Sequence, residues 1–159
     1  MLPGEVLQFL SERSPRDALF TVDGGLSALH AQTNLSLHPQ RRLLTTIRWI
    51  TPGYALPAAI GAAMAGPDRS ILCLTSGRSL LMNAQELAVC ALRQLPIVLF
   101  VAGHPEDRSR PDFPRLAEAY GLQGASCSNL EELNVAWGQA EAARTTFLIE
   151  CKAGWGAQS

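Results

Sequence analysis

Residues Ser76-Gly77-Arg78-Ser79 stand between two segments with different hydrophobic patterns. An apolar run at 71–74 precedes them, and apolar residues then repeat at helical spacing from Leu80 to Leu92. This order predicts a strand, a tight turn and a helix. Backbone N–H groups at such a helix start, with the helix dipole behind them, can hold an anion, and Gly77 would let a phosphate approach the backbone.

The same four residues also fit a plain strand-to-helix connection that is capped by Ser79. A single glycine is a weak signal for phosphate binding, because the known phosphate loops combine it with further glycines or a lysine. The turn therefore has two interpretations, an anion site and a capped connection.

Strands and helices are expected to alternate around this turn. Apolar runs predict strands at 18–22, 43–47, 71–74, 97–101 and 146–151, and a further short strand is expected at 125–127. Helices are predicted at 3–13, 56–65, 80–92, 112–120 and 129–143. Residues 26–41 have no clear pattern; one or two helical turns are expected at 26–32 and a polar loop at 38–42. The pattern predicts an α/β fold with a mainly parallel central sheet of about six strands and helices on both faces.

Length and composition indicate one domain. The 159 residues are 47% hydrophobic and 17% charged with a net charge of −1, which argues against a disordered chain and against an electrostatic nucleic-acid binder. No apolar run reaches the ~20 residues of a membrane span, and the N-terminus has no basic segment before a long apolar one. We expect a cytoplasmic protein with a single domain over 1–153 and a flexible tail over 154–159.

The four cysteines are widely spaced, without a C-x-x-C pair. They are Cys73, Cys90, Cys127 and Cys151, and two of them fall in apolar runs that are predicted as strands. Buried reduced thiols are expected here, rather than disulfides, metal ligands or a nucleophile.

Four segments, in their order along the chain, resemble the acetolactate synthase group of thiamine diphosphate (ThDP) enzymes. They are 53–62, 81–87, 95–96, and 111–113 together with 116–121, which include Leu81-Met82-Asn83 and Pro111-Asp112-Phe113. The resemblance is to the diphosphate-binding, C-terminal domain of these enzymes and covers nearly the whole chain. It implies the ThDP-binding fold, with a diphosphate pocket formed by Asp23, Gly53 and Ser76, Gly77, Arg78 and Ser79.

In that family a divalent cation holds the diphosphate, bound by an Asp in a G-D-G-S turn and by an Asn further along the chain. The resemblance places Gly77 at the Asp position and His104 at the Asn position. Glycine offers no side-chain ligand, and imidazole is a poor ligand for Mg²⁺ beside oxygen donors. Arg78 adds a fixed positive charge where the family has a glycine. The resemblance therefore implies that the metal site is lost, and no bound metal or cofactor is expected.

The family's catalytic Glu lies in a separate pyrimidine-binding domain, and this chain is too short to contain one. We do not expect the chain to be an active enzyme alone. The first hypothesis is a non-catalytic assembly or regulatory subunit that forms a homo-oligomer or binds a pyrimidine-domain chain, with no nucleic-acid or membrane partner.

Two alternatives keep a ligand at the turn. In one, the chain is the diphosphate-binding subunit of a split ThDP-dependent 2-oxo acid decarboxylase or ligase, which binds ThDP with Mg²⁺ or uses Arg78 in place of the metal. In the other, the residues at 76–79, with Arg108 or Arg110, bind a different phosphorylated or carboxylated small molecule.

Overall fold

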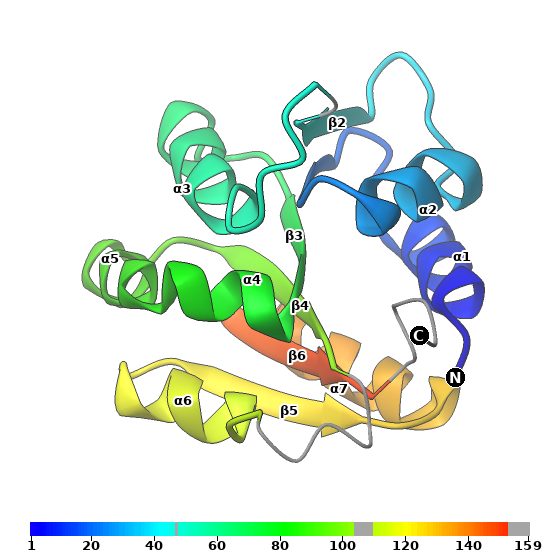
Figure 1. Cartoon of the computed structure of the whole chain (residues 1–159). Helices are drawn as coiled ribbons and strands as arrows, with labels where there is room; N and C mark the ends of the chain where they lie inside the picture. The colour runs from blue at the N-terminus through cyan, green and yellow to red at the C-terminus, as the bar shows by residue number, and fades with distance from the viewer. Residues whose placement is uncertain (47, 104–109, 153–159) are drawn as a thin grey trace.

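All six strands of the central sheet run parallel in the computed structural model of the chain, which describes residues 1–46, 48–103 and 110–152. The order across the sheet is β2-β1-β3-β4-β6-β5 (Figure 1). The strands are β1 (Leu19–Val22), β2 (Arg42–Thr45), β3 (Ile71–Ser76), β4 (Ile97–Ala102), β5 (Gln123–Cys127) and β6 (Phe147–Cys151). The predicted mainly parallel six-stranded sheet is confirmed.

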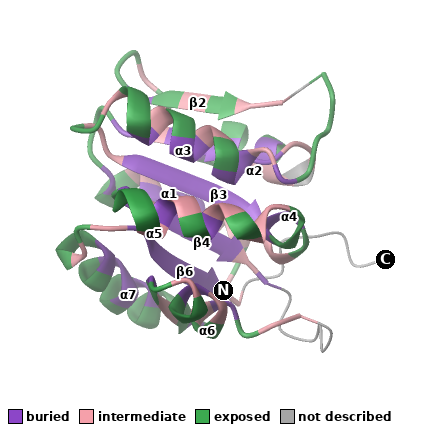
Figure 2. Cartoon of the chain, turned by 90° about the vertical axis from the view of Figure 1, so that its left-hand side faces the viewer, coloured by how far each residue is buried: buried purple, intermediate pink, exposed green. Residues whose placement is uncertain are grey.

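Helices cover both faces of this sheet (Figures 1 and 2). One face carries α1 (Pro3–Arg13), α2 (Leu26–Asn34) and α7 (Leu130–Ala142). The other carries α3 (Ala55–Ala65), α4 (Gly77–Met82), α5 (Leu87–Arg93) and α6 (Phe113–Ala119), and the 3₁₀ turn η1 (Ala84–Glu86) joins α4 to α5. Of the described helices, none has the length and apolar character needed to cross a lipid bilayer.

Two hydrophobic cores lie on the two sides of the sheet, and the central strands supply both. Successive residues of a strand point to opposite faces, so Leu72 and Leu74 of β3 enter the core under α1, α2 and α7, while Ile71 and Cys73 enter the other. β3 is buried along almost its whole length (Figure 2), which explains why its sequence is a continuous apolar run without alternation.

The predicted turn at 76–79 is absent, because β3 extends to Ser76 and α4 begins directly at Gly77. The predicted single helix at 80–92 is also wrong. The helix is interrupted at Asn83, between the end of α4 and the start of η1. The Asn83 side chain donates a hydrogen bond to the Gly53 carbonyl. Residues 26–41, which lack a clear pattern, form α2 over much of their length.

The predicted cap and stop of α6 agree with the structure, whereas β2 (Arg42–Thr45) and β5 (Gln123–Cys127) differ by about two residues from the predicted 43–47 and 125–127. Asp112 caps α6 by accepting from the Arg115 N–H at 3.1 Å, and Gly121 follows that helix at φ +80°.

All four cysteines are free and buried. The predicted tail at 154–159 lies outside the described residues.

Candidate functional site

The carboxyl ends of β1 and β3 lie where the order of the strands reverses: β2 is added on one side of β1, and β3 and β4 follow on the other side. The chain leaves β1 for β2 on one side and returns to β3 on the other, so the connecting helices α2 and α3 depart to opposite faces. In parallel α/β sheets, ligands bind at this switch point, outside the carboxyl ends of the strands. Asp23 and Ser76 lie there, one directly after β1 and the other at the end of β3.

Asp23 joins three elements at the switch point. Its side chain is 2% exposed, and one carboxylate oxygen accepts a hydrogen bond at 3.0 Å from the N–H of Ala55, the first residue of α3. The other oxygen accepts from the hydroxyl of Thr75 in β3. A carboxylate at a helix start also interacts favourably with the helix dipole. Asp23 thus connects the end of β1 to β3 and α3, and both of its carboxylate oxygens accept a hydrogen bond from the protein.

Gly53 lies beside the helix that begins at Gly77. Its φ of +79° favours glycine, and its carbonyl accepts from the Asn83 side chain at 2.5 Å. A Cβ atom on Gly53 would lie 2.5 Å from the Asn83 amide nitrogen and 3.4 Å from the Ser79 carbonyl oxygen. The site residues predicted from the sequence, Asp23, Gly53 and 76–79, are therefore brought together at one edge of the sheet.

The start of α4 is capped by Ser76, rather than by Ser79. The Ser76 hydroxyl accepts from the Ser79 N–H at 3.2 Å and donates to the Ser79 hydroxyl at 3.0 Å. One of the amide groups that an anion would need is thus already satisfied inside the protein. The geometry favours the capped connection over an open anion site.

Gly77, which the sequence resemblance places at the family's metal-binding Asp, faces the ring of Phe113 from α6. A Cβ atom added to Gly77 would lie 2.6 Å from Cζ and 2.8 Å from Cε2 of that ring. Phe113 is fully buried, so the ring cannot simply turn out into solvent. Position 77 therefore has neither a ligand side chain nor the space for one.

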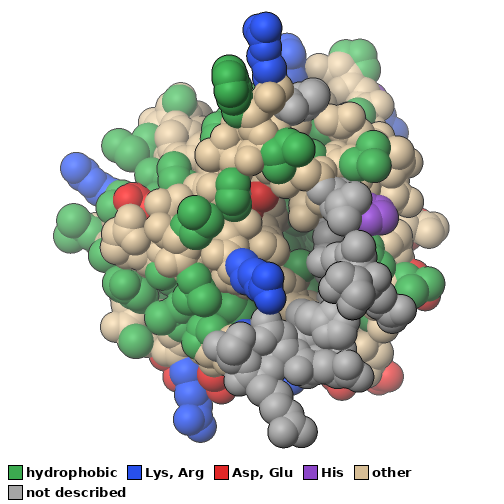
Figure 3. Space-filling model, in the orientation of Figure 1, with side chains coloured by type: hydrophobic (Ala, Val, Ile, Leu, Met, Phe, Trp, Pro, Cys, Tyr) green, Lys and Arg blue, Asp and Glu red, His purple; other side chains and the backbone are tan. Residues whose placement is uncertain are grey.

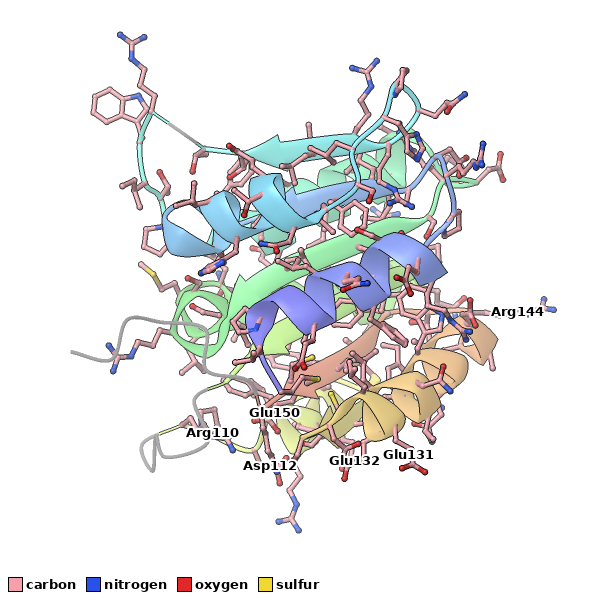
Figure 4. All side chains as sticks on the ribbon, turned by 90° about the vertical axis from the view of Figure 1, so that its right-hand side faces the viewer. Arg110, Asp112, Glu131, Glu132, Arg144 and Glu150 are labelled. Atoms are coloured by element: carbon pink, nitrogen blue, oxygen red, sulfur yellow. The ribbon has the colours of Figure 1, made fainter. Side chains whose placement is uncertain are left out.

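The charged side chains at this edge differ in their contacts. Arg78 is exposed and has no ion-pair or hydrogen-bond partner within the described part of the chain. Arg110, in contrast, forms an ion pair with Glu150 of β6, and the two side chains point toward one another in Figure 4. Glu150 is 2% exposed and its second oxygen accepts from the Ser126 hydroxyl. Arg110 is thus held in place by the protein itself.

Sequence reasoning did not identify Thr75, Asn83, Phe113 or Glu150 as contributors to this edge. Asn83 and Phe113 are in the segments that carry the family resemblance, but their contacts depend on the fold. His104 and Arg108, named from the sequence, lie outside the described residues. In the described ranges, no three His, Cys, Asp or Glu side chains form a group that could hold a metal ion.

Comparison with known families gives a match over residues 23–103, which include Asp23, Gly53 and the start of α4. The matching model is described as "Thiamine pyrophosphate enzyme, C-terminal TPP binding domain". The chain belongs to this family. The resemblance inferred from the sequence is therefore confirmed, and thiamine diphosphate is the cofactor that the family name specifies.

Relatives support the same assignment, and a solved structure has the same fold. The chain is 27% identical to acetolactate synthase isozyme 2 large subunit and 31% identical to isozyme 3 large subunit, both from Escherichia coli (strain K12). Each alignment covers 82% of this chain, but only 28% and 26% of those proteins. A thiamine diphosphate-dependent 4-hydroxybenzoylformate decarboxylase from Rhodococcus jostii RHA1 has the same fold, with a TM-score of 0.87 at 23% identity over 98% of this chain and 33% of the decarboxylase chain.

Around Gly77, where the sequence resemblance places the family's metal ligand, the described residues do not fit a metal-bound diphosphate. Mg²⁺ prefers carboxylate and other oxygen ligands, yet Gly77 supplies no side-chain oxygen and Phe113 fills the adjoining space. The nearby carboxylates of Asp23 and Glu150 are engaged by donors of the protein.

Proposed function

We propose that this chain is a ThDP-binding domain that has lost metal-dependent binding of ThDP and acts as a non-catalytic assembly or regulatory subunit. The observation that carries the proposal is the packing of the Phe113 ring against Gly77, where a metal ligand would need to project. The chain spans about a quarter of the length of the acetolactate synthase relatives that it matches.

An apolar outer surface on α3, α4 and α5 supports the assembly role. All eleven residues of α3 are apolar or glycine, although Pro57, Gly61 and Met64 are exposed. Leu81 and Met82 of α4 are also exposed, as is Leu92 of α5 at 81%. Hydrophobic side chains gather over the left-hand side of the view in Figure 3, where these helices lie in Figure 1. Such surfaces on a small protein favour contact with another protein.

Calorimetric titration with ThDP and Mg²⁺ tests the loss of binding. We expect no binding by the natural protein, and a gain of metal-dependent binding when Gly77→Asp and Arg78→Gly restore the family's residues at these two positions and Phe113→Leu provides space for the new carboxylate. Gly138→Asp is the matched control, because a Cβ there meets nothing within 4 Å and an Asp can be added without a clash. Micromolar binding by the natural protein would contradict the proposal.

Sedimentation velocity tests the assembly surface. We expect the natural protein to self-associate and Met64→Glu with Leu92→Glu to shift it to the monomer, since each change places a charge on the apolar surface. Val135→Glu is the control, because Val135 is 58% exposed but lies on α7, across the sheet. A natural protein that is monomeric at every concentration, or equal effects of the two sets of changes, would rule out this surface.

A split ThDP-dependent decarboxylase or ligase is the second candidate, supported by Arg78. Its exposed guanidinium lies at the switch point without a partner among the described residues, so it is available for a diphosphate. This candidate predicts ThDP binding that survives chelation of the metal and is lost in Arg78→Ala, whereas the exposed Arg93→Ala on α5 should have no effect.

A further inference from the structure

Cys127 and Cys151 lie directly opposite one another on neighbouring strands. They are the last residues of β5 and β6, they are paired in the sheet register, and their Sγ atoms are 3.6 Å apart. Both thiols are free and lie in the core beneath α1, α2 and α7. Cys73 and Cys90, in contrast, belong to the core on the other face of the sheet.

We propose that Cys127 and Cys151 are an oxidisable dithiol that closes to a disulfide when hydrogen peroxide reaches it. Directly paired residues on adjacent strands are about 4.8 Å apart at their Cα atoms, within the range that a disulfide can span. The two sulfur atoms need to approach by only about 1.5 Å to reach bonding distance, which side-chain rotation can supply.

The position of β5 at the sheet edge gives the oxidant a route to this buried pair. β5 pairs with β6 alone, and Ser126 beside Cys127 is exposed. Opening the end of β5 breaks the pairing with one strand only, so it requires less free energy than global unfolding. The hydrogen bond between the two thiols lowers the pKa of Cys127, whereas that bond and burial raise the pKa of Cys151. Cys127 is therefore the better nucleophile.

The reaction has two steps. The Cys127 sulfur attacks one oxygen of the peroxide, the O–O bond breaks, and a water molecule leaves with the thiol proton, which gives a sulfenic acid. The Cys151 sulfur then attacks the sulfenic sulfur, the S–S bond forms, the S–O bond breaks, and a second water molecule leaves with the Cys151 proton. The dithiol loses two electrons, and the peroxide is reduced to two water molecules.

Mass spectrometry of the folded protein after peroxide treatment tests this reaction. We expect the intact mass to fall by two hydrogens, the thiols titrated in denaturant to fall from four to two, and a digest to contain a peptide pair joined through Cys127 and Cys151. A thiol reductant should restore all four thiols. The Cys73→Ala, Cys90→Ala variant retains the pair, so it should also lose two hydrogens, and its titrated thiols should fall from two to none.

Three results would overturn the proposal. They are four remaining thiols after prolonged treatment, a disulfide between any other cysteines or between two chains, and sulfinic acid at Cys127 without a linked peptide. The peptide map of the natural protein decides among them, so the test does not depend on whether Cys127→Ala folds. Where the Cys127→Ala variant does fold, its intact mass should not fall by two hydrogens after peroxide treatment.

Discussion

At the scale of single residues, the Arg41 side chain makes four hydrogen bonds to backbone carbonyls. Its side chain is 5% exposed and donates to the carbonyls of Ser11, Ser14, Pro15 and Ser36 at 3.0 to 3.2 Å. The guanidinium also lies 5.7 Å from the centre of the Phe20 ring. Arg41 thus fastens the end of α1 to the segment that follows α2.

Replacing this side chain should weaken the whole fold. We expect Arg41→Met to lower the free energy of unfolding by about 2–4 kcal/mol, because four buried or partly buried carbonyls lose a charged donor. Urea unfolding measures the change. Arg42→Met is the matched control, since Arg42 is exposed, and should change stability by less than about 0.5 kcal/mol. Equal effects of the two variants would show that the contacts of Arg41 contribute little.

The sequence alone does not distinguish these two arginines. Arg41 and Arg42 are neighbours in a segment expected to be a polar loop, and no local pattern shows which one is buried. Burial depends on carbonyls from the end of α1, which the fold brings close. The contact between Gly77 and Phe113 is equally non-local, so the sequence indicates the missing ligand but not the lack of space.

At the scale of elements, capping decides where α7 begins. The Asn129 side chain accepts from the Glu132 N–H at 2.9 Å, and the Glu132 carboxylate accepts from the Ser128 N–H at 2.7 Å. Figure 4 shows Glu131 and Glu132 at this end of the helix. This boundary could be predicted from the sequence, because Asn followed three residues later by Glu is a local signal.

The cap should contribute measurably to stability. We expect Asn129→Ala to lower the free energy of unfolding by about 1 kcal/mol, since the Glu132 N–H loses its acceptor. Glu131→Ala is the control in the same turn, because the Glu131 side chain makes no hydrogen bond within the described part of the chain. It should have less than half the effect of Asn129→Ala. Thermal and urea unfolding of both variants would decide, and a larger loss in Glu131→Ala would contradict the capping argument.

The break between α4 and α5 shows the limit of local signals. Apolar residues repeat at helical spacing on both sides of Asn83, so the sequence predicts one helix. The helix is interrupted because Asn83 donates to Gly53, which is distant along the chain. A tertiary contact thus overrides the local pattern at the edge where the candidate site lies.

At the scale of the whole molecule, the order of elements was predictable because each strand and helix has its own local pattern. Continuous apolar runs separated by helices indicate parallel strands, and the sheet confirms this. The state of the site was less predictable, since it depends on which side chains meet at the ends of β1, β3, β4 and β6.

Buried thiols should make the free energy of unfolding depend on pH in the alkaline range. Burial raises the pKa of Cys90 from 9.0 to about 11, and it also raises the pKa of Cys73. The unfolded chain therefore releases these protons at lower pH than the folded protein does. The contribution of the protonated thiols to the free energy of unfolding is fully present below pH 9. It is lost as pH rises from 9 toward 11, and for Cys90 the loss is about 2–3 kcal/mol.

Urea unfolding between pH 8 and about 11 checks this prediction. Cys90→Ala should lower stability by a constant amount from lost packing and should also show a shallower decline above pH 9. The difference in slope between the natural protein and the variant is the relevant quantity, because other groups that titrate in this range affect both. Parallel curves would contradict the assigned cause.

The all-parallel sheet has a kinetic consequence. No two adjacent strands can pair as a hairpin, since every connection between them must pass over the sheet, in most cases through a helix. The first native strand pair can form only after a long loop has closed, which costs chain entropy before any contact compensates for it. Refolding should therefore be slow compared with a helical bundle of the same length. During that delay, the apolar strands β3 and β4 are exposed to other chains, so dilute conditions and low temperature should improve the recovery of folded protein.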